Sequence, residues 1–219
     1  MAKEFWVKRV LLSKSKEPAV MPDLESIVAR QVSRYIQLGF HTQLGESEDE
    51  YRAEFALPKD IKQPESYKGR FDVLLVVDPR IHTVMQNRIA DISQFGINID
   101  EIINLTEFPS NVPYAVWTHN GKKYSYYSVE KVLKLLADDE LGSPVLEVTA
   151  LYLQHSEYFK GVGVRGVYAA GSRYEKNRIP ALLKVGNDKT YPYWSTALHQ
   201  SHAGSRGKEI IRLGIKYIK

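Results

Sequence analysis

Cysteine is absent from the 219 residues, which excludes disulfides, thiolate metal ligands and a cysteine nucleophile. No apolar run approaches the roughly 18 residues that a membrane-spanning helix requires. The first residues, Met1 to Trp6, include an acid and lack the uninterrupted apolar stretch of a signal peptide. We therefore expect a soluble, cytoplasmic protein without a membrane partner.

Several functional motifs are missing as well. The apolar run 73–77 is followed by Asp78-Pro79-Arg80, so the junction to the next helix lacks the glycines that cradle phosphates in dinucleotide sites and P-loops. No nucleophile elbow, zinc-protease helix or calcium-binding loop occurs. His199 and His202 have few acids near them to supply a third metal ligand. We expect neither a cofactor nor a metal.

The composition is that of a globular protein, since 43% of the residues are hydrophobic and 26% are charged. A chain of this length buries roughly 70% of its unfolded surface, which is enough for a core without disulfides. A polar segment bounded by prolines ends at Pro22. The sequence thus predicts an N-terminal strand and connector over residues 1–22 and a single domain over residues 23–219.

Apolar residues recur at helical spacing in five segments. The first begins after Asp23, a suitable N-cap, and ends at Gly39, where a left-handed residue is favoured. Ser47 and Glu50 form a capping box at the start of the second. The predicted helices span about 24–36, 48–57, 81–92, 129–136 and 145–152.

Short β-branched and aromatic runs predict the strands. The continuous apolar run 73–77 is typical of a strand covered on both faces, and Asn120-Gly121 predicts a hairpin turn between 114–118 and 122–127. The remaining predicted strands span 4–12, 165–170, 179–185, 189–197 and 209–218. Helices thus dominate the first two thirds, and the last third and the central hairpin form a mostly antiparallel sheet. This is an α+β fold.

Charge is unevenly distributed along the chain. Residues 160–219 contain 12 lysines and arginines against three acids, whereas the remaining residues contain 18 against 23. Such asymmetry can indicate an anionic partner, although charges from both parts can also mix on the surface of one folded body.

The Gly-Ser-Arg sequence occurs twice in this basic part, at residues 171–173 and 204–206. Glycine lets backbone N–H groups converge on an anion, serine adds a hydroxyl and arginine adds a bidentate fork. Two unrelated turns are the alternative. The candidate anion-binding residues are Ser172, Arg173, Arg178, His199, Ser205 and Arg206.

Aromatic residues accompany these basic residues. Tyr191, Tyr193 and Trp194 occur on one predicted strand, and fourteen tyrosines occur in the whole chain. Aromatic rings interleaved with basic side chains can stack on the bases of single-stranded nucleic acid. Tyrosine is also common at half-buried strand positions, which is the alternative interpretation.

The order of several motifs resembles a known family. Gly171-Ser172-Arg173 precedes Ile179-Pro180-Ala181-Leu182, an aromatic cluster that ends at Trp194, and His199. In this order the chain resembles an uncharacterised bacterial domain-of-unknown-function family over roughly residues 24–202. That family has cysteines at positions near Tyr174 and Tyr193, where this chain has other residues. The role of those family positions therefore cannot be transferred to this chain. The resemblance implies one compact domain and no particular activity.

Three functions remain open from the sequence. The first is a binding module whose basic C-terminal region takes nucleic acid or a phosphorylated small molecule. The second is a metal-independent transferase or hydrolase that uses His199 as proton carrier beside Arg173 and Arg206. The third is a protein–protein interaction module whose first and last strands pair with another chain.

Overall fold

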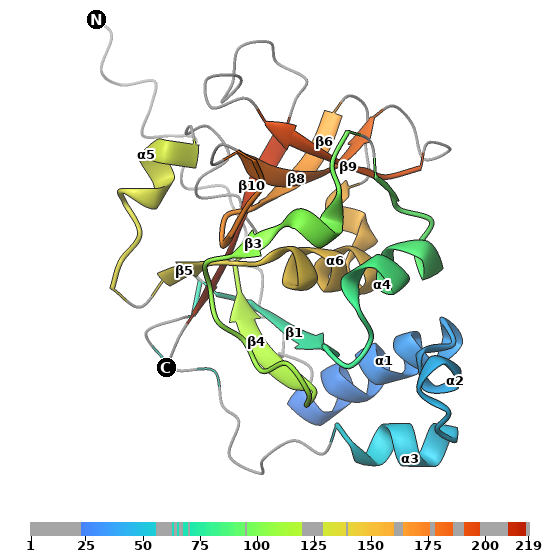
Figure 1. The fold of residues 1–219 in the computed structure, drawn as a ribbon. Helices are drawn as coiled ribbons and strands as arrows, with labels where there is room; N and C mark the ends of the chain where they lie inside the picture. Colours follow the sequence, from blue (N-terminus) through green and yellow to red (C-terminus); the bar gives the residue numbers. More distant parts are fainter. Residues whose placement is uncertain are drawn as a thin grey trace, which may run out of the picture.

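A computed structural model of the chain describes residues 23–55, 63, 65, 68–69, 71–94, 96–119, 129–138, 140–159, 164–175, 178–185, 191–197 and 210–217 (Figure 1). The predicted strand and connector over residues 1–22 lie outside these residues. So does the second strand of the predicted central hairpin.

Helices and strands are both present, so the predicted α+β class is confirmed. The helices are α1 (Leu24–Gln37), α2 (Phe40–Leu44), α3 (Glu48–Ala53), α4 (Thr83–Ile89), α5 (Val129–Leu133) and α6 (Val145–Gln154), with 3₁₀ turns η2 (Ile99–Glu101) and η4 (Ser156–Phe159). The strands are β1 (Val73–Val77), β2 (Ser93–Gln94), β3 (Ile103–Asn104), β4 (Tyr114–Thr118), β5 (Glu140–Gly142), β6 (Val164–Ala169), β7 (Ser172–Arg173), β8 (Ile179–Val185), β9 (Tyr193–Ala197) and β10 (Ile210–Tyr217).

Most strands belong to one sheet in the order β1-β4-β10-β6-β8-β9-β2, with β5 also paired to β10. Neighbours are antiparallel, except that β10 is parallel to β6 and β2 is parallel to β9. In Figure 1 the orange and red strands of the C-terminal third continue into β4 and β1. The last strand of the chain therefore lies inside the sheet, with neighbours on both sides, rather than at an exposed edge.

The buried strand β1 joins two parts of the core. Leu74 and Val76 pack with aromatic side chains of the α1–α3 region, whereas Val73, Leu75 and Val77 pack with α6. This alternation follows from the two-residue period of a strand. All five side chains are buried, which confirms the prediction of a strand covered on both faces.

The outer edge of β1 is covered by side chains of α1. Gln31 Nε2 donates to the carbonyl of Leu74 at 2.7 Å, and the N–H of Val76 donates to Gln31 Oε1 at 2.8 Å. The Tyr35 hydroxyl donates to the carbonyl of Val76 at 2.9 Å, and burial raises the pKa of Tyr35, which keeps its proton in place. The amide of Gln31 thus replaces the peptide group of a further strand, and this edge is closed to pairing with another chain.

Two of the local signals at helix ends agree with the structure, whereas the side chain of Asp23 precedes α1 without forming a capping hydrogen bond. Gly39 has a φ of 79°, and Ser47 with Glu50 forms the predicted capping box. Hydrogen bonds from the backbone and side chain of Ser47 lower the pKa of Glu50. Helix α4 ends at Ile89, earlier than predicted, because Ser93 and the residue after it pair with β9. No helix in the described part of the chain is long and apolar enough to span a membrane.

Candidate anion-binding site

The first Gly-Ser-Arg segment lies where three parts of the backbone meet. The N–H of Gly171 donates to the carbonyl of Ser143 at 2.9 Å, and the carbonyl of Gly171 accepts the N–H of Leu105 at 2.7 Å. A Cβ added at Gly171 would lie 2.2 Å from the carbonyl oxygen of Gly142. The glycine therefore permits a close contact between backbones. It does not open a loop to solvent.

Ser172 is fully buried and hydrogen-bonded on both sides. Its hydroxyl donates to Asn104 Oδ1 at 2.6 Å and accepts the N–H of Val145, the first residue of α6, at 3.0 Å. The first N–H groups of a helix have no partner within the helix, so this contact satisfies one of them. A hydroxyl has a single proton, and that of Ser172 is donated to Asn104. The predicted anion-binding role of Ser172 is replaced by a structural one.

Arg173 is half-buried beside this junction. Its Nη1 donates to the carbonyls of Ala170, at 2.9 Å, and Ser172, at 2.7 Å. Burial lowers the pKa of Arg173, but an arginine keeps its charge in proteins. No described carboxylate forms an ion pair with it. Its neighbour across the β3–β7 pair is Ile103, which is 65% exposed.

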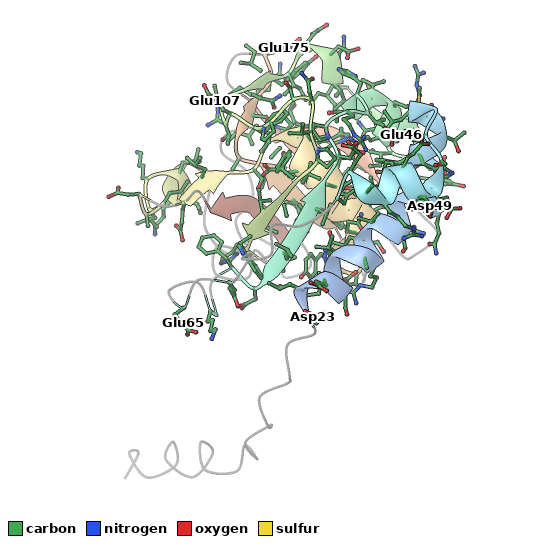
Figure 2. All side chains as sticks on the ribbon, turned by 90° about the horizontal axis from the view of Figure 1, so that it is seen from below. Asp23, Glu46, Asp49, Glu65, Glu107 and Glu175 are labelled. Carbon is green, nitrogen blue, oxygen red and sulfur yellow. The ribbon has the colours of Figure 1, made fainter. Side chains whose placement is uncertain are left out.

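Arg178 differs from Arg173 because it has an acidic partner. Its Nη2 lies 2.8 Å from Glu175 Oε2, and its Nη1 donates to Thr196 Oγ1 at 3.4 Å. In Figure 2, Glu175, and with it the ion pair to Arg178, lies at the end of the molecule opposite Asp23, the residue that precedes α1. Arg178 is paired with Tyr174, and two residues paired across strands point to the same face of the sheet. Arg173 directly precedes Tyr174, and successive residues of a strand point to opposite faces. Arg173 and Arg178 therefore point to different faces.

A largely buried cluster at the end of β1 contains an arginine whose positive charge is compensated by neighbouring carboxylates. Arg80 Nη2 lies 2.9 Å from Asp78 Oδ2, its Nη1 lies 2.9 Å from Glu46 Oε1, and its guanidinium lies over the ring of Tyr51. The Tyr51 hydroxyl also donates to the fully buried Asp78 at 2.9 Å. Each charge has an opposite charge beside it, so this cluster holds the fold together and offers no unpaired cation.

Trp194 is a core residue. Its side chain is fully buried, and its Nε1 donates to Asn87 Oδ1 at 3.3 Å. A ring enclosed on both faces has no surface on which a base can stack. The prediction that Trp194 stacks on a base is therefore wrong, because its ring is buried against α4 and α6. The sequence of the strand alone does not show this burial.

The two tyrosines of the aromatic cluster lie away from Arg178. Tyr191 is 71% exposed and Tyr193 is half-buried at the start of β9. The other end of β9, Ala197, is paired with Ile179, which follows Arg178. Ala197 is four residue steps along the strand from Tyr193, which corresponds to about 13 Å. The structure does not bring the aromatic residues and Arg178 together.

His199, Ser205 and Arg206 lie outside the described residues. The proximity of the two Gly-Ser-Arg segments therefore stays a prediction, and so does the enzyme hypothesis that needs His199. In the part of the chain that the structure describes, no three potential metal ligands are grouped together.

No family model, curated protein or solved structure matches the chain. The resemblance to the uncharacterised bacterial family stays a prediction. Function is therefore inferred from the chemistry of the residues.

One group of cationic residues was not predicted as a site. A cavity of about 290 Å³ between α1 and the end of α6 is lined by Arg30, Gln31, Ser33, Arg34, Gln37, Gln154 and His155. The sequence signal is the four-residue spacing of Arg30 and Arg34, which places both on one side of a helix. The approach of His155 is a tertiary contact, and no local pattern predicts it.

Proposed function

We propose that the protein is a binding module for an anionic partner, which it contacts through Arg173. The observation that supports this proposal is a half-buried guanidinium without a carboxylate partner among the described residues. Removing a cation from water costs free energy, and a bound anion offsets that cost. Arg80, which has the same chemistry, is compensated by Asp78 and Glu46.

The hydrogen bonds of Arg173 leave one side of the guanidinium available. Nη1 is held by two backbone carbonyls, whereas Nε and Nη2 have no hydrogen-bond partner among the described residues. The Nε–H and one Nη2–H are parallel, and together they match two oxygens of a phosphate or carboxylate. Because Nη1 is already fixed, little side-chain entropy is lost when an anion binds.

Two further observations concern the kind of anion. The excess of basic residues over residues 160–219 supports a partner with several negative charges. The burial of Trp194 and the distance of the two tyrosines from Arg178 reduce the surface for stacking bases. We therefore favour a phosphorylated small molecule over single-stranded nucleic acid.

The test compares the wild-type protein with Arg173→Ala, Arg173→Lys and the matched control Arg88→Ala, an exposed arginine on α4. Calorimetry with pyrophosphate and fluorescence anisotropy with a labelled single-stranded oligonucleotide measure binding. We expect Arg173→Ala to weaken binding by about tenfold, which corresponds to about 1.4 kcal/mol. Arg173→Lys should lose less, because it keeps the charge without the fork.

Equal affinities for Arg173→Ala and Arg88→Ala would contradict the proposal. The salt dependence separates the two kinds of partner. If the oligonucleotide is the partner, the slope of log affinity against log salt should fall by about 0.7 when one phosphate contact is removed. A flat salt response would exclude nucleic acid.

A further inference from the structure

The cavity between α1 and α6 is separate from Arg173. It lies at the C-terminal end of α6, where Gln154 and His155 line it. The hydroxyl of Ser172, next to Arg173, contacts Val145 at the other end of the same helix. Ten helical residues extend about 15 Å, so the two places are too far apart to hold one small ligand.

Two of the lining residues form a fixed wall. The side chain of Gln31 is 2% exposed and is bonded to the edge of β1. Gln154 Nε2 donates to the backbone carbonyl of Gln31 at 3.2 Å. These contacts connect the cavity to the buried edge strand β1, so its shape is set by the core.

Cations line the cavity and acids do not. Arg30 and Arg34 are exposed, and neither forms an ion pair with a described residue. His155 Nδ1 lies 3.0 Å from Glu157 Oε1, whereas its buried Nε2 has no hydrogen-bond partner. Because this nitrogen is inaccessible to solvent, a ligand in the cavity does not reach it, and the two arginines are the charged groups available to an anion.

Neutral donors complete the lining. Ser33 Oγ accepts a hydrogen bond from Arg52 Nη1 at 3.0 Å, which leaves the proton of Ser33 available for donation. The amide of Gln37, at the end of α1, is exposed. Hydroxyl and amide groups of this kind recognise the hydroxyls of a polar ligand.

Helix dipoles do not account for all of this positive charge. Cations are favoured at helix C-termini, and the cavity lies near the C-terminal ends of α1 and α6. Each end contributes roughly half an elementary negative charge, so two ends amount to about one. Arg30 and Arg34 carry two full positive charges. The helix ends therefore offset about half of this charge, and the Glu157 carboxylate, 3.0 Å from His155 Nδ1, offsets more on the His155 side, so the positive charge is concentrated at the two guanidinium groups.

We infer that this cavity binds a small phosphorylated polyol, with the phosphate held by Arg30 and Arg34 and the hydroxyls by Ser33 and Gln37. Two guanidinium forks match the three terminal oxygens of a phosphate ester better than the two oxygens of a carboxylate. The volume of about 290 Å³ is at the lower limit of ligand pockets, which suits a ligand of this size and excludes a dinucleotide.

Calorimetric titrations with glycerol 3-phosphate, inorganic phosphate and glycerol test the site. Glycerol 3-phosphate should bind more tightly than inorganic phosphate, and glycerol alone should not bind. Arg30→Ala and Arg34→Ala should each weaken binding of glycerol 3-phosphate by about tenfold, and Arg34→Lys should weaken it less. Arg88→Ala, the matched control, should leave the affinity unchanged.

The variants replace exposed side chains, and thermal unfolding should show that they remain folded. The site is overturned if the wild-type protein binds no phosphate compound, or if Arg34→Ala and Arg88→Ala have equal affinities. Equal affinities for glycerol 3-phosphate and inorganic phosphate would overturn the polyol part. Titrations repeated in the Arg173→Ala background lack the contact of the proposed function and report on this cavity alone, so this site and the proposed function at Arg173 can fail independently.

Discussion

The contact between Gln31 and the edge of β1 allows a quantitative prediction about stability. Gln31→Leu keeps most of the side-chain volume and removes both hydrogen-bonding groups. The carbonyl of Leu74 and the N–H of Val76 then remain buried without a partner, because Gln31 and Tyr35 close this edge to water.

The expected loss follows from those two groups. A buried backbone group without a partner costs about 1–3 kcal/mol, so two cost about 2–6 kcal/mol. The apolar leucine offsets part of this cost, and we expect a net loss of about 3 kcal/mol. For a protein of this size, 1 kcal/mol lowers Tm by about 2–4 °C, so Tm should fall by about 6–12 °C.

Urea unfolding followed by circular dichroism measures the change in the free energy of unfolding. Gln43→Leu is the matched control, because Gln43 is exposed on α2 and should change stability by no more than about 0.5 kcal/mol. If Gln31→Leu loses no more than Gln43→Leu, the amide does not stabilise the edge and the reasoning is refuted.

Two further substitutions test other contacts by the same unfolding measurement. Gly171→Ala places a Cβ 2.2 Å from the carbonyl of Gly142 and should cost at least about 1–3 kcal/mol, and an unchanged midpoint would contradict the close contact. Arg80→Met leaves the fully buried Asp78 without its cation and should cost about 3–5 kcal/mol. The double variant that combines Arg80→Met with Asp78→Asn should lose less stability than Arg80→Met alone. A loss equal to the sum of the losses of the two single variants would refute the pairing.

Local patterns were sufficient for several elements. The apolar spacing after Asp23, the capping box of Ser47 and Glu50, and the apolar run 73–77 correspond to α1, α3 and β1. Strand 179–185 has the predicted bounds. These signals depend on residues close together in the sequence, because helix capping and side-chain periodicity act over a few residues.

Only the tertiary structure determined how these elements combine. The last strand lies inside the sheet, parallel to β6, Trp194 is buried against α4 and α6, and the hydroxyl of Ser172 is used to cap α6. Each depends on partners far away in the sequence, so no local window contains the information. The same applies to the cavity, where Arg30 and Arg34 come from α1 and His155 follows α6. Composition and local pattern determined which segments form helices and strands, whereas long-range packing decided which polar groups became structural and which remained available to a ligand.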